Sequence, residues 1–261
     1  MAESLFIVTG ASRGMGAAIQ QQLLAPPNTV VGISRGVNEA LQNMALVSGA
    51  TLEQWPRDLS DAPAVADELE RWLKRFDAQR FARAALINNA GVVTPPGPVD
   101  QCTTAELSSA LRVGLEATVL LTAAFLRATR GWHAMRQGEV KVLNISSGLG
   151  RRAMAGSAPY CASKAGMDHF SRAAALDEAH CLATRGAGAK IVSLAPGVID
   201  TDMQLQLRSA DSAGFPDKAN FVGMHASGQL TTPHDAAARV LAFLNRRDFG
   251  SNPVADVRDP S

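Results

Sequence analysis

The residues best suited to proton chemistry lie in a short run beyond the middle of the chain. Tyr160 is the only tyrosine, and Lys164 follows it by four positions. Residues four apart lie on one face of a helix, and an ammonium beside a phenol favours the phenolate. We therefore expect the pKa of Tyr160 to fall from its usual value of about 10 towards neutrality, which suits a general acid.

A hydroxyl group is expected beside this pair. Ser147 comes thirteen residues before Tyr160 and closely follows an apolar run that is typical of a strand. Ligands of open α/β sheets bind at the carboxyl ends of the strands, so Ser147 is predicted to hold a substrate carbonyl oxygen there. A Tyr and Lys pair by itself is more often a surface contact of a helix. Ser147 and the glycine-rich turn described next favour a catalytic role for Ser147, Tyr160 and Lys164.

A glycine-rich turn near the N-terminus has the pattern of a dinucleotide site. It follows an apolar run at 5–9 and precedes a helical pattern. Glycines let the chain approach a pyrophosphate, and the free N–H groups and dipole of a helix N-terminus stabilise the anion. Glycine clusters also occur in purely structural turns, but the order of strand, turn and helix favours a cofactor site. The predicted cofactor-binding residues of this turn are Gly10, Ser12, Arg13, Gly14, Met15 and Gly16.

The end of the second strand indicates which nicotinamide cofactor is bound. An acidic residue there binds the ribose 2′-hydroxyl of NAD, whereas a basic residue accommodates the 2′-phosphate of NADP. The residue at this place is Arg35, and Arg13 of the glycine-rich turn is expected to approach the same phosphate. The alternative is that both are solvated surface arginines. We predict NADPH or NADP as the cofactor.

Apolar runs of strand length alternate with segments of helical period, which is the pattern of βαβ units and a parallel sheet. The expected strands lie at 5–9, 29–34, 51–56, 84–88, 140–145, 190–195 and 253–257, and the expected helices at 14–25, 62–76, 104–136, 159–184 and 233–246. With no internal repeat or linker, residues 1–261 are predicted to form one doubly wound, Rossmann-type α/β domain. Its sheet is expected to be mostly parallel and seven-stranded, with helices on both faces.

One connection, at about 197–230, is too long for a simple turn. It contains several glycines and shows only weak periodicity. Loops of this length in a compact domain are usually lids or binding segments, so we expect it to contact the substrate. Of the five histidines, only His225 lies in this segment.

Composition and charge narrow the classes of partner. The 25 basic and 24 acidic residues give a formal net charge of +1, so a small molecule is a better partner than nucleic acid or anionic lipid. Cys102, Cys161 and Cys181 lack metal-ligand spacing, which predicts reduced thiols in a cytoplasmic protein and no metal site. We identify no signal segment and no apolar run long enough to cross a bilayer, so no membrane partner is expected.

Over essentially its whole length the chain resembles the short-chain dehydrogenase/reductase family. The glycine-rich turn and the Ser147, Tyr160 and Lys164 set match the cofactor turn and catalytic triad of that family. The resemblance implies that Lys164 also binds the nicotinamide ribose. It further implies that Asp58 and Leu59 contact the adenine. By the same resemblance, the segment of Asn89, Ala90 and Gly91 lines the cofactor. The nicotinamide carboxamide would be held by Pro196, Gly197 and Thr201.

One position departs from the family pattern. The family usually has a catalytic asparagine in its long fourth helix, and Gly114 occupies the corresponding position. The resemblance implies a water-mediated proton relay that reaches Lys164 through this helix. A backbone carbonyl can still hold that water, so we expect slower proton resupply and the same reaction type.

The segment 195–204 and the tail at 253–259 are similar to the subgroup that contains sepiapterin reductase and bacterial benzil reductases. In sepiapterin reductase an aspartate of this tail anchors the pterin, and Asp256 stands at the matching position. Asp256 is therefore a candidate substrate contact. The alternative, that it merely ends the last strand, remains open.

Together these features predict an NADPH-dependent carbonyl reductase. It is expected to reduce a ketone, diketone or pterin-like carbonyl, with Tyr160 as proton donor. One alternative is an NADPH-binding sensor without turnover, and another is an NADP-dependent alcohol dehydrogenase or 3-oxoacyl reductase. The resemblance also implies a homodimer or homotetramer formed through the long helices at 104–136 and 159–184.

Overall fold

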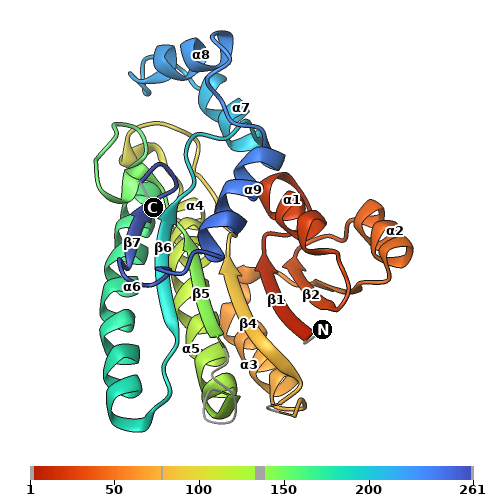
Figure 1. Ribbon diagram of the computed structural model, residues 1–261. Coiled ribbons are helices and arrows are strands. Elements are labelled where there is room, and N and C mark those ends of the chain that lie inside the picture. Colours follow the sequence, from red (N-terminus) through yellow and green to blue (C-terminus); the bar gives the residue numbers. More distant parts are fainter. Residues whose placement is uncertain (1–2, 78, 133–138, 260–261) are drawn as a thin grey trace.

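A computed structural model describes residues 3–77, 79–132 and 139–259, and within them the chain forms a seven-stranded sheet (Figure 1). The strands are β1 (Glu3–Thr9), β2 (Asn28–Ser34), β3 (Thr51–Pro56), β4 (Phe81–Asn88), β5 (Glu139–Ile145), β6 (Lys190–Ala195) and β7 (Val254–Asp256). Their order is β3-β2-β1-β4-β5-β6-β7, and every neighbouring pair is parallel. The predicted fold class is confirmed, since the order reverses between β1 and β4 as in a doubly wound sheet.

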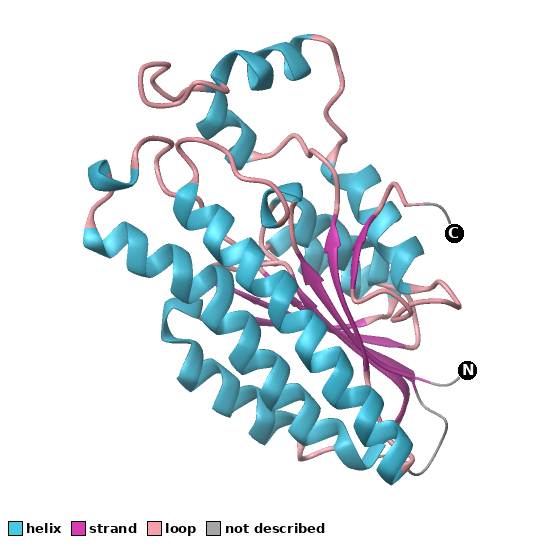
Figure 2. Ribbon diagram, turned by 90° about the vertical axis from the view of Figure 1, so that its left-hand side faces the viewer, coloured by secondary structure: helices cyan, strands magenta, loops and turns pink. Residues whose placement is uncertain are grey.

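Helices cover both faces of the sheet (Figure 2). They are α1 (Gly14–Leu23), α2 (Glu39–Ser48), α3 (Ala62–Leu73), α4 (Thr104–Leu111), α5 (Ala117–Thr129), α6 (Ala158–Arg185), α7 (Asp202–Arg208), α8 (Lys218–Ala226) and α9 (Pro233–Leu244). One apolar core lies between the sheet and α1 and α9, and a second lies between the sheet and α3, α5 and α6. Strands buried on both sides are expected to be apolar along their whole length, and this explains the unbroken apolar runs.

Strand β1 shows how the two cores are built. Successive side chains of a strand point to opposite faces. Phe6 and Val8 belong to the core under α1 and α9, while Leu5 and Ile7 belong to the core under α3 and α5, and all four are at most 1% exposed. Full burial of each such side chain contributes about 1.5–3 kcal/mol to folding.

Several helix ends follow from local side-chain chemistry. Thr103 and Glu106 form a reciprocal capping box at the start of α4, and Thr232 accepts from the N–H of Asp235 at the start of α9. Helix α6 ends at Arg185 and is capped by Gly186, whose φ of 69° is in the left-handed region that glycine tolerates. These caps satisfy backbone groups that the helices themselves leave without partners.

Helix α2 was not predicted, although residues 35–50 contain it. Only Leu41 and Ala45 of α2 are buried, while Leu46 and Val47 are 73% and 90% exposed. Apolar residues on the outer face obscure the helical period. The sequence pattern therefore predicts only a connection between β2 and β3.

The long helix predicted at 104–136 is interrupted in the structure. It consists of α4, a π-helical turn at Arg112–Glu116, α5 and a short 3₁₀ turn, and residues 133–136 lie outside the described part. The stretch Thr104–Trp132 has 29 residues and contains an 18-residue window with a mean hydropathy of 1.5, so by length and composition alone it is able to cross a membrane. The expectation that no run is long enough is therefore wrong. Core helices meet the same criterion, and α5 buries Leu121 and Phe125 completely against the sheet and α3.

The segment at 197–230, expected to be a loop, contains the helices α7 and α8. Together they form a lobe that stands above the carboxyl ends of the strands (Figure 1). A small apolar cluster of Leu207, Ala210 and Phe215 holds the lobe together, with Phe221 and Met154 packed against it. The two helices are too short, at 7 and 9 residues, for their periodicity to stand out in the sequence.

Candidate active site

A groove of about 940 Å³ runs along the carboxyl ends of the strands, under the lobe. Its lining comes from the glycine-rich turn, from segments after β2, β3, β4, β5 and β6, and from α6 and α7. Every residue predicted to bind cofactor or substrate, or to act in catalysis, lines this groove. Parallel strands bring their carboxyl ends to one edge of the sheet, which explains how residues from 10 to 256 converge there. The individual roles stay predictions.

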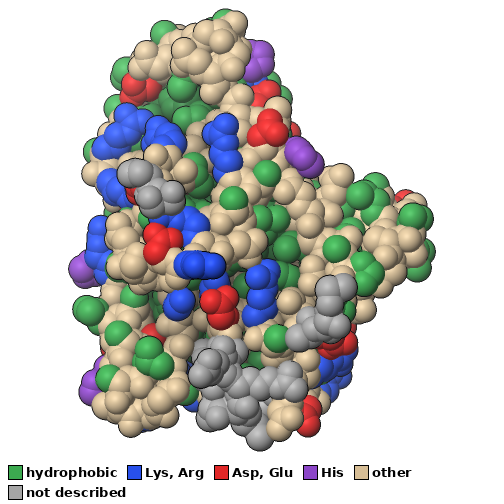
Figure 3. Space-filling view, in the orientation of Figure 1, with side chains coloured by type: hydrophobic (Ala, Val, Ile, Leu, Met, Phe, Trp, Pro, Cys, Tyr) green, Lys and Arg blue, Asp and Glu red, His purple; other side chains and the backbone are tan. Residues whose placement is uncertain are grey.

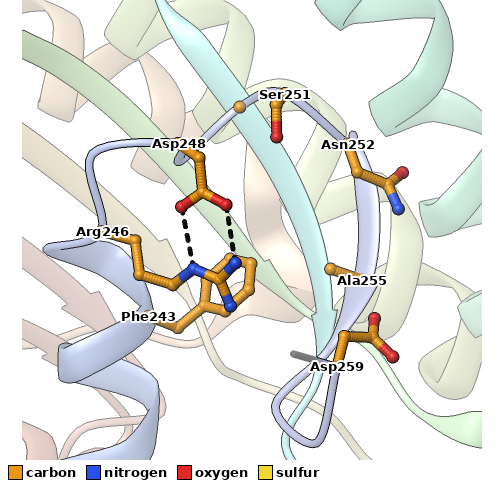
Figure 4. Close-up of a pocket in the computed structure, with 8 residues that line it drawn as sticks. Phe243, Arg246, Asp248, Ser251, Asn252, Ala255 and Asp259 are labelled. Carbon is orange, nitrogen blue, oxygen red and sulfur yellow. Dashed lines mark hydrogen bonds and ion pairs between the residues drawn. The ribbon is translucent and has the colours of Figure 1, made fainter. Parts of the chain in front are cut away.

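A second, smaller cavity of about 160 Å³ lies near the C-terminal tail (Figure 4). The ion pair between Arg246 and Asp248 lies in its wall, with an N–O distance of 2.6 Å. None of the predicted site residues lines it. This cavity is therefore separate from the chemistry.

The predicted catalytic residues meet at the ends of β5 and α6. Ser147 directly follows Ser146 at the end of β5, and its hydroxyl accepts from the N–H of Leu149 at 3.2 Å and hydrogen-bonds Tyr160. Lys164 is 3% exposed, and its Nζ donates to the carbonyl oxygen of Ile145 at 2.7 Å. The same Nζ lies 5.6 Å from the centre of the Tyr160 ring.

The pKa of Tyr160 is not lowered as the sequence predicts. Burial raises the pKa of Tyr160 to about 12, and the hydrogen bond with Ser147 opposes that rise only in part. Burial also lowers the pKa of Lys164 to about 8, against the attraction of Asp168. Desolvation of the phenolate thus outweighs the nearby ammonium. The phenol is fully protonated at neutral pH, as a proton donor needs to be.

The glycine-rich turn is shaped for close approach. Gly10 has a φ of 65°, and a Cβ at Gly16 would overlap the carbonyl oxygen of Gly10. The side chain of Asn89 donates to the carbonyl oxygen of Thr9 at 2.9 Å, and the Thr9 hydroxyl accepts from the backbone N–H groups of Asn89 and Ala90. These bonds fix the turn against the end of β4. The crowded backbone leaves the open side of the turn facing the groove, which suits a pyrophosphate.

The end of the groove beside β2 is basic. Arg35 is exposed and, among the described residues, has no ion pair within 4 Å. The pKa of Asp58 is lowered mainly by the backbone hydrogen bond from Ser60 and to a smaller extent by the charge of Arg35. Arg13 pairs with Asp202 at the start of α7 across a distance of 2.9 Å, with both side chains about 70% exposed. Arg57 also lines this end and was missed by the sequence analysis, because it follows β3. An unpaired guanidinium at this place fits an additional phosphate.

Asp256, the candidate substrate contact, lines the opposite part of the groove. It is 8% exposed, and both carboxylate oxygens accept from the guanidinium of Arg258, at 2.7 and 2.6 Å. This ion pair lowers the pKa of Asp256. Asp256 therefore both ends β7 and faces the groove with an occupied carboxylate. In the view of Figure 3, Lys and Arg side chains gather beneath the lobe.

Two further residues near the groove were missed by the sequence analysis. Gln204 of α7 is 7% exposed and lines the groove, and its Oε1 has no hydrogen-bond partner in the described part of the chain. Asp168 lies four positions after Lys164 and is 1% exposed. The spacing of Asp168 is a signal that the sequence offers, whereas nothing in the sequence shows that Gln204 is buried.

Gly114, which replaces the usual asparagine, lies buried in the π-helical turn. A Cβ at this position would lie 3.0 Å from the Ser163 hydroxyl and 3.1 Å from its Cβ. Ser163 thus fills the space beside the glycine. An asparagine side chain has no room here unless α6 shifts.

Comparison with known proteins agrees with this geometry. The family model for short chain dehydrogenases matches residues 4–212. The chain belongs to the short-chain dehydrogenase/reductase family. It is 31% identical to a benzil reductase ((S)-benzoin forming) of Bacillus cereus over 248 residues, which cover 95% of this chain and 96% of that protein.

Other members of the short-chain dehydrogenase/reductase family are also similar over nearly the whole chain. A benzil reductase of Bacillus subtilis (strain 168) is 32% identical over 93% of both chains, and sepiapterin reductase of Rattus norvegicus is 27% identical over 97% of this chain and 95% of that one. Among solved structures, a metagenomic short-chain oxidoreductase in complex with NADP covers 97% of this chain and 94% of its own, with 27% identity and a TM-score of 0.69. The expected family and subgroup are confirmed, and the chain is an oxidoreductase of the benzil reductase-like, carbonyl-reducing kind.

Proposed function

We propose that this protein is an NADPH-dependent carbonyl reductase in which Tyr160 donates the proton. The observation that carries the proposal is that Ser147, Tyr160 and Lys164 line one groove at the carboxyl edge of the sheet, with Nζ of Lys164 5.6 Å from the centre of the Tyr160 ring. The names of the related benzil and sepiapterin reductases support a ketone, a diketone or a pterin-like carbonyl as substrate.

The residues of the chain account for the steps around the carbonyl group. A bound nicotinamide would supply the hydride. The Ser147 and Tyr160 hydroxyls hold the carbonyl oxygen and stabilise the negative charge that develops on it. Tyr160 then gives up its proton, and the phenolate left behind is stabilised by the ammonium of Lys164 and by Ser147.

The preference for NADPH rests on Arg35. Its guanidinium directly follows β2 and has no ion pair among the described residues, and Arg13 of the glycine-rich turn lines the same groove, so the two fit a 2′-phosphate. The NADP complex of a related oxidoreductase supports the same cofactor class. Since cells usually keep NADP reduced, reduction is the proposed working direction.

Replacing Tyr160 by phenylalanine tests the proposal. The variant Tyr160→Phe is expected to lose most turnover while it binds NADPH with nearly unchanged affinity, because only the proton donor is removed. NADPH consumption with a panel of diketones, quinones and pterins, followed at 340 nm, measures turnover. Unchanged turnover in the variant refutes the assignment, and NADPH binding without consumption by the wild type favours a sensor.

We also propose a homodimer or homotetramer in the cytoplasm. Leu111 of α4 and Leu176 and Leu182 of α6 are 44%, 73% and 57% exposed on the long helices, and the free cysteines agree with a reducing compartment. Light scattering of the purified protein measures the number of subunits. A monomer at micromolar concentration contradicts the first part of this proposal.

A further inference from the structure

Asp168 is a buried carboxylate near the catalytic residues that the steps above do not use. It is 1% exposed. Its Oδ1 accepts hydrogen bonds from the hydroxyls of Ser146 and Ser193, both at 2.6 Å, and its Oδ2 lies 3.3 Å from Nε of Arg151. Burial of an ionised carboxylate is costly unless it is paired and hydrogen-bonded. Three donors on one side chain show that the surroundings are built for the charged form.

These donors come from the elements that carry the reaction. Ser146 directly follows β5 and precedes Ser147, and its N–H donates to the carbonyl oxygen of Leu194 of β6 at 2.8 Å. Ser193 lies in β6, and Arg151 follows the short turn that Ser147 caps. Asp168 itself belongs to α6, the helix of Tyr160 and Lys164. One carboxylate therefore joins the strand end that bears Ser147 to the helix that bears the other two.

The packing around this carboxylate is tight. A Cβ at Gly150 would lie 2.8 Å from Oδ2 of Asp168 and 2.9 Å from the carbonyl oxygen of Lys164. The guanidinium of Arg151 also donates through Nη2 to the carbonyl oxygen of Ala255 at 2.8 Å, which ties the network to β7 beside Asp256. The network thus spans three strands and α6.

We propose that Asp168 is a positioning residue for the reductase reaction. Asp168 holds Lys164 in its ammonium form inside the protein and fixes the position of Ser147, just beyond the end of β5, relative to α6. This inference rests on the proposed function and adds a residue to its machinery. Asp168 acts through Lys164 and Ser146, and it is expected to touch neither substrate nor cofactor.

The electrostatics around Lys164 support this role. Burial lowers the pKa of Lys164 to about 8, and Asp168 is the carboxylate that opposes this effect. Tyr160, which is neutral, also faces Lys164, and Arg151 is the cation that pairs with Asp168, with its Nε 3.3 Å from Oδ2. The segments at Ile145 and Gly91 present backbone to Nζ, while Arg112 and Glu116 of the π-helical turn are exposed. In the described part of the chain, removal of Asp168 leaves the ammonium without an anion.

The decisive experiment is the pH profile of Asp168→Asn. Asparagine keeps the size and one acceptor oxygen but removes the charge. The basic limb of kcat/KM against pH, measured with saturating NADPH, is expected to move about one unit lower, the size of effect that one close opposite charge produces. Ser193→Ala is the matched control, since it removes one hydrogen bond and leaves the charge. Its melting temperature is expected to fall while its basic limb stays in place.

Each result decides the inference. The inference is overturned if the basic limb of kcat/KM in Asp168→Asn lies at the same pH as in the wild type. It is also overturned if Ser193→Ala moves that limb as far as Asp168→Asn does. Should Asp168→Asn not fold by circular dichroism, Arg151→Met takes its place. That variant leaves the carboxylate without its guanidinium, so the basic limb is expected to move upwards, and an unchanged or lower limb overturns the inference.

The pH dependence of NADPH binding, followed by fluorescence, separates this inference from the proposed function. Lys164 is expected to contact the nicotinamide ribose, so its loss of charge weakens binding even without turnover. If the pH dependence of NADPH binding is displaced in Asp168→Asn, the role of Asp168 is supported, even where Tyr160→Phe keeps full activity and the proposed reaction fails. If that pH dependence is unchanged in Asp168→Asn while Tyr160→Phe loses turnover, the role of Asp168 is refuted and the reductase assignment stands.

Discussion

Replacement of Arg35 by serine is expected to change cofactor preference and little else. Arg35 is exposed at the end of β2 with no ion pair within 4 Å among the described residues, so its removal leaves no protein group without a partner. A hydrogen bond to a charged group contributes about 1.5–3 kcal/mol. Because Arg35 is exposed to solvent, the lower half of that range applies, which corresponds to a loss of roughly 10- to 40-fold in NADPH affinity.

The assay is a titration of NADPH and NADH into wild type and Arg35→Ser, with dissociation constants from nicotinamide fluorescence. NADH affinity is expected to stay within about twofold, since NADH lacks the 2′-phosphate that the guanidinium binds. Arg71→Ser is the matched control, because Arg71 is an exposed arginine of α3 that does not line the groove. Equal losses for both cofactors, or no loss for NADPH, would refute the reasoning.

Two further predictions concern the buried groups beside the substrate. The value of kcat/KM is expected to fall as pH rises through about 8, because Lys164 loses its proton there while Tyr160, with a pKa of about 12, remains an acid; a flat profile from pH 7 to 10 contradicts this. Gly114→Ala is expected to lower the melting temperature, since a Cβ 3.1 Å from that of Ser163 costs more than the gain of about 1 kcal/mol from helix propensity. Gly114→Ala is expected to cost less stability in a Ser163→Gly background than in the wild type, because the contact with the Ser163 side chain is then absent, and a Gly114→Ala variant more stable than the wild type would contradict the packing argument.

The raised pKa of Tyr160 indicates at which stage of the reaction the phenolate is stabilised. In the protein without cofactor the phenol is a weak acid, and the Lys164 ammonium does not compensate for desolvation. Stabilisation of the phenolate therefore has to increase when the carbonyl oxygen begins to take the proton. Interactions that strengthen only at that stage accelerate the reaction, whereas a phenolate in the resting site would have no proton to give.

Much of the fold and the site was predictable because the signals are local. The apolar runs of β1 to β7, the glycine-rich turn and the four-residue spacing of Tyr160 and Lys164 each lie within a short stretch of chain. A parallel sheet then brings the ends of its strands to one edge by geometry alone. The sequence therefore determined the seven strands, the location of the groove and many of the residues that line it, although Arg57 and Gln204 were missed.

Other properties arise only when distant residues meet and water is excluded. The helix α2 was missed because its outer face is apolar, and α7 and α8 because each is short. The direction of the Tyr160 pKa shift depends on burial that no spacing rule contains.

The polar pairings around the groove also arise only when residues distant in the sequence meet. Asp168 meets Ser193 across 25 positions of sequence, Arg13 meets Asp202 from the lobe, and Ser163 fills the space beside Gly114. Residue type and local spacing decide which groups are present at the groove. The tertiary structure alone decides their charge and their partners, because desolvation and long-range contacts set the energies of both.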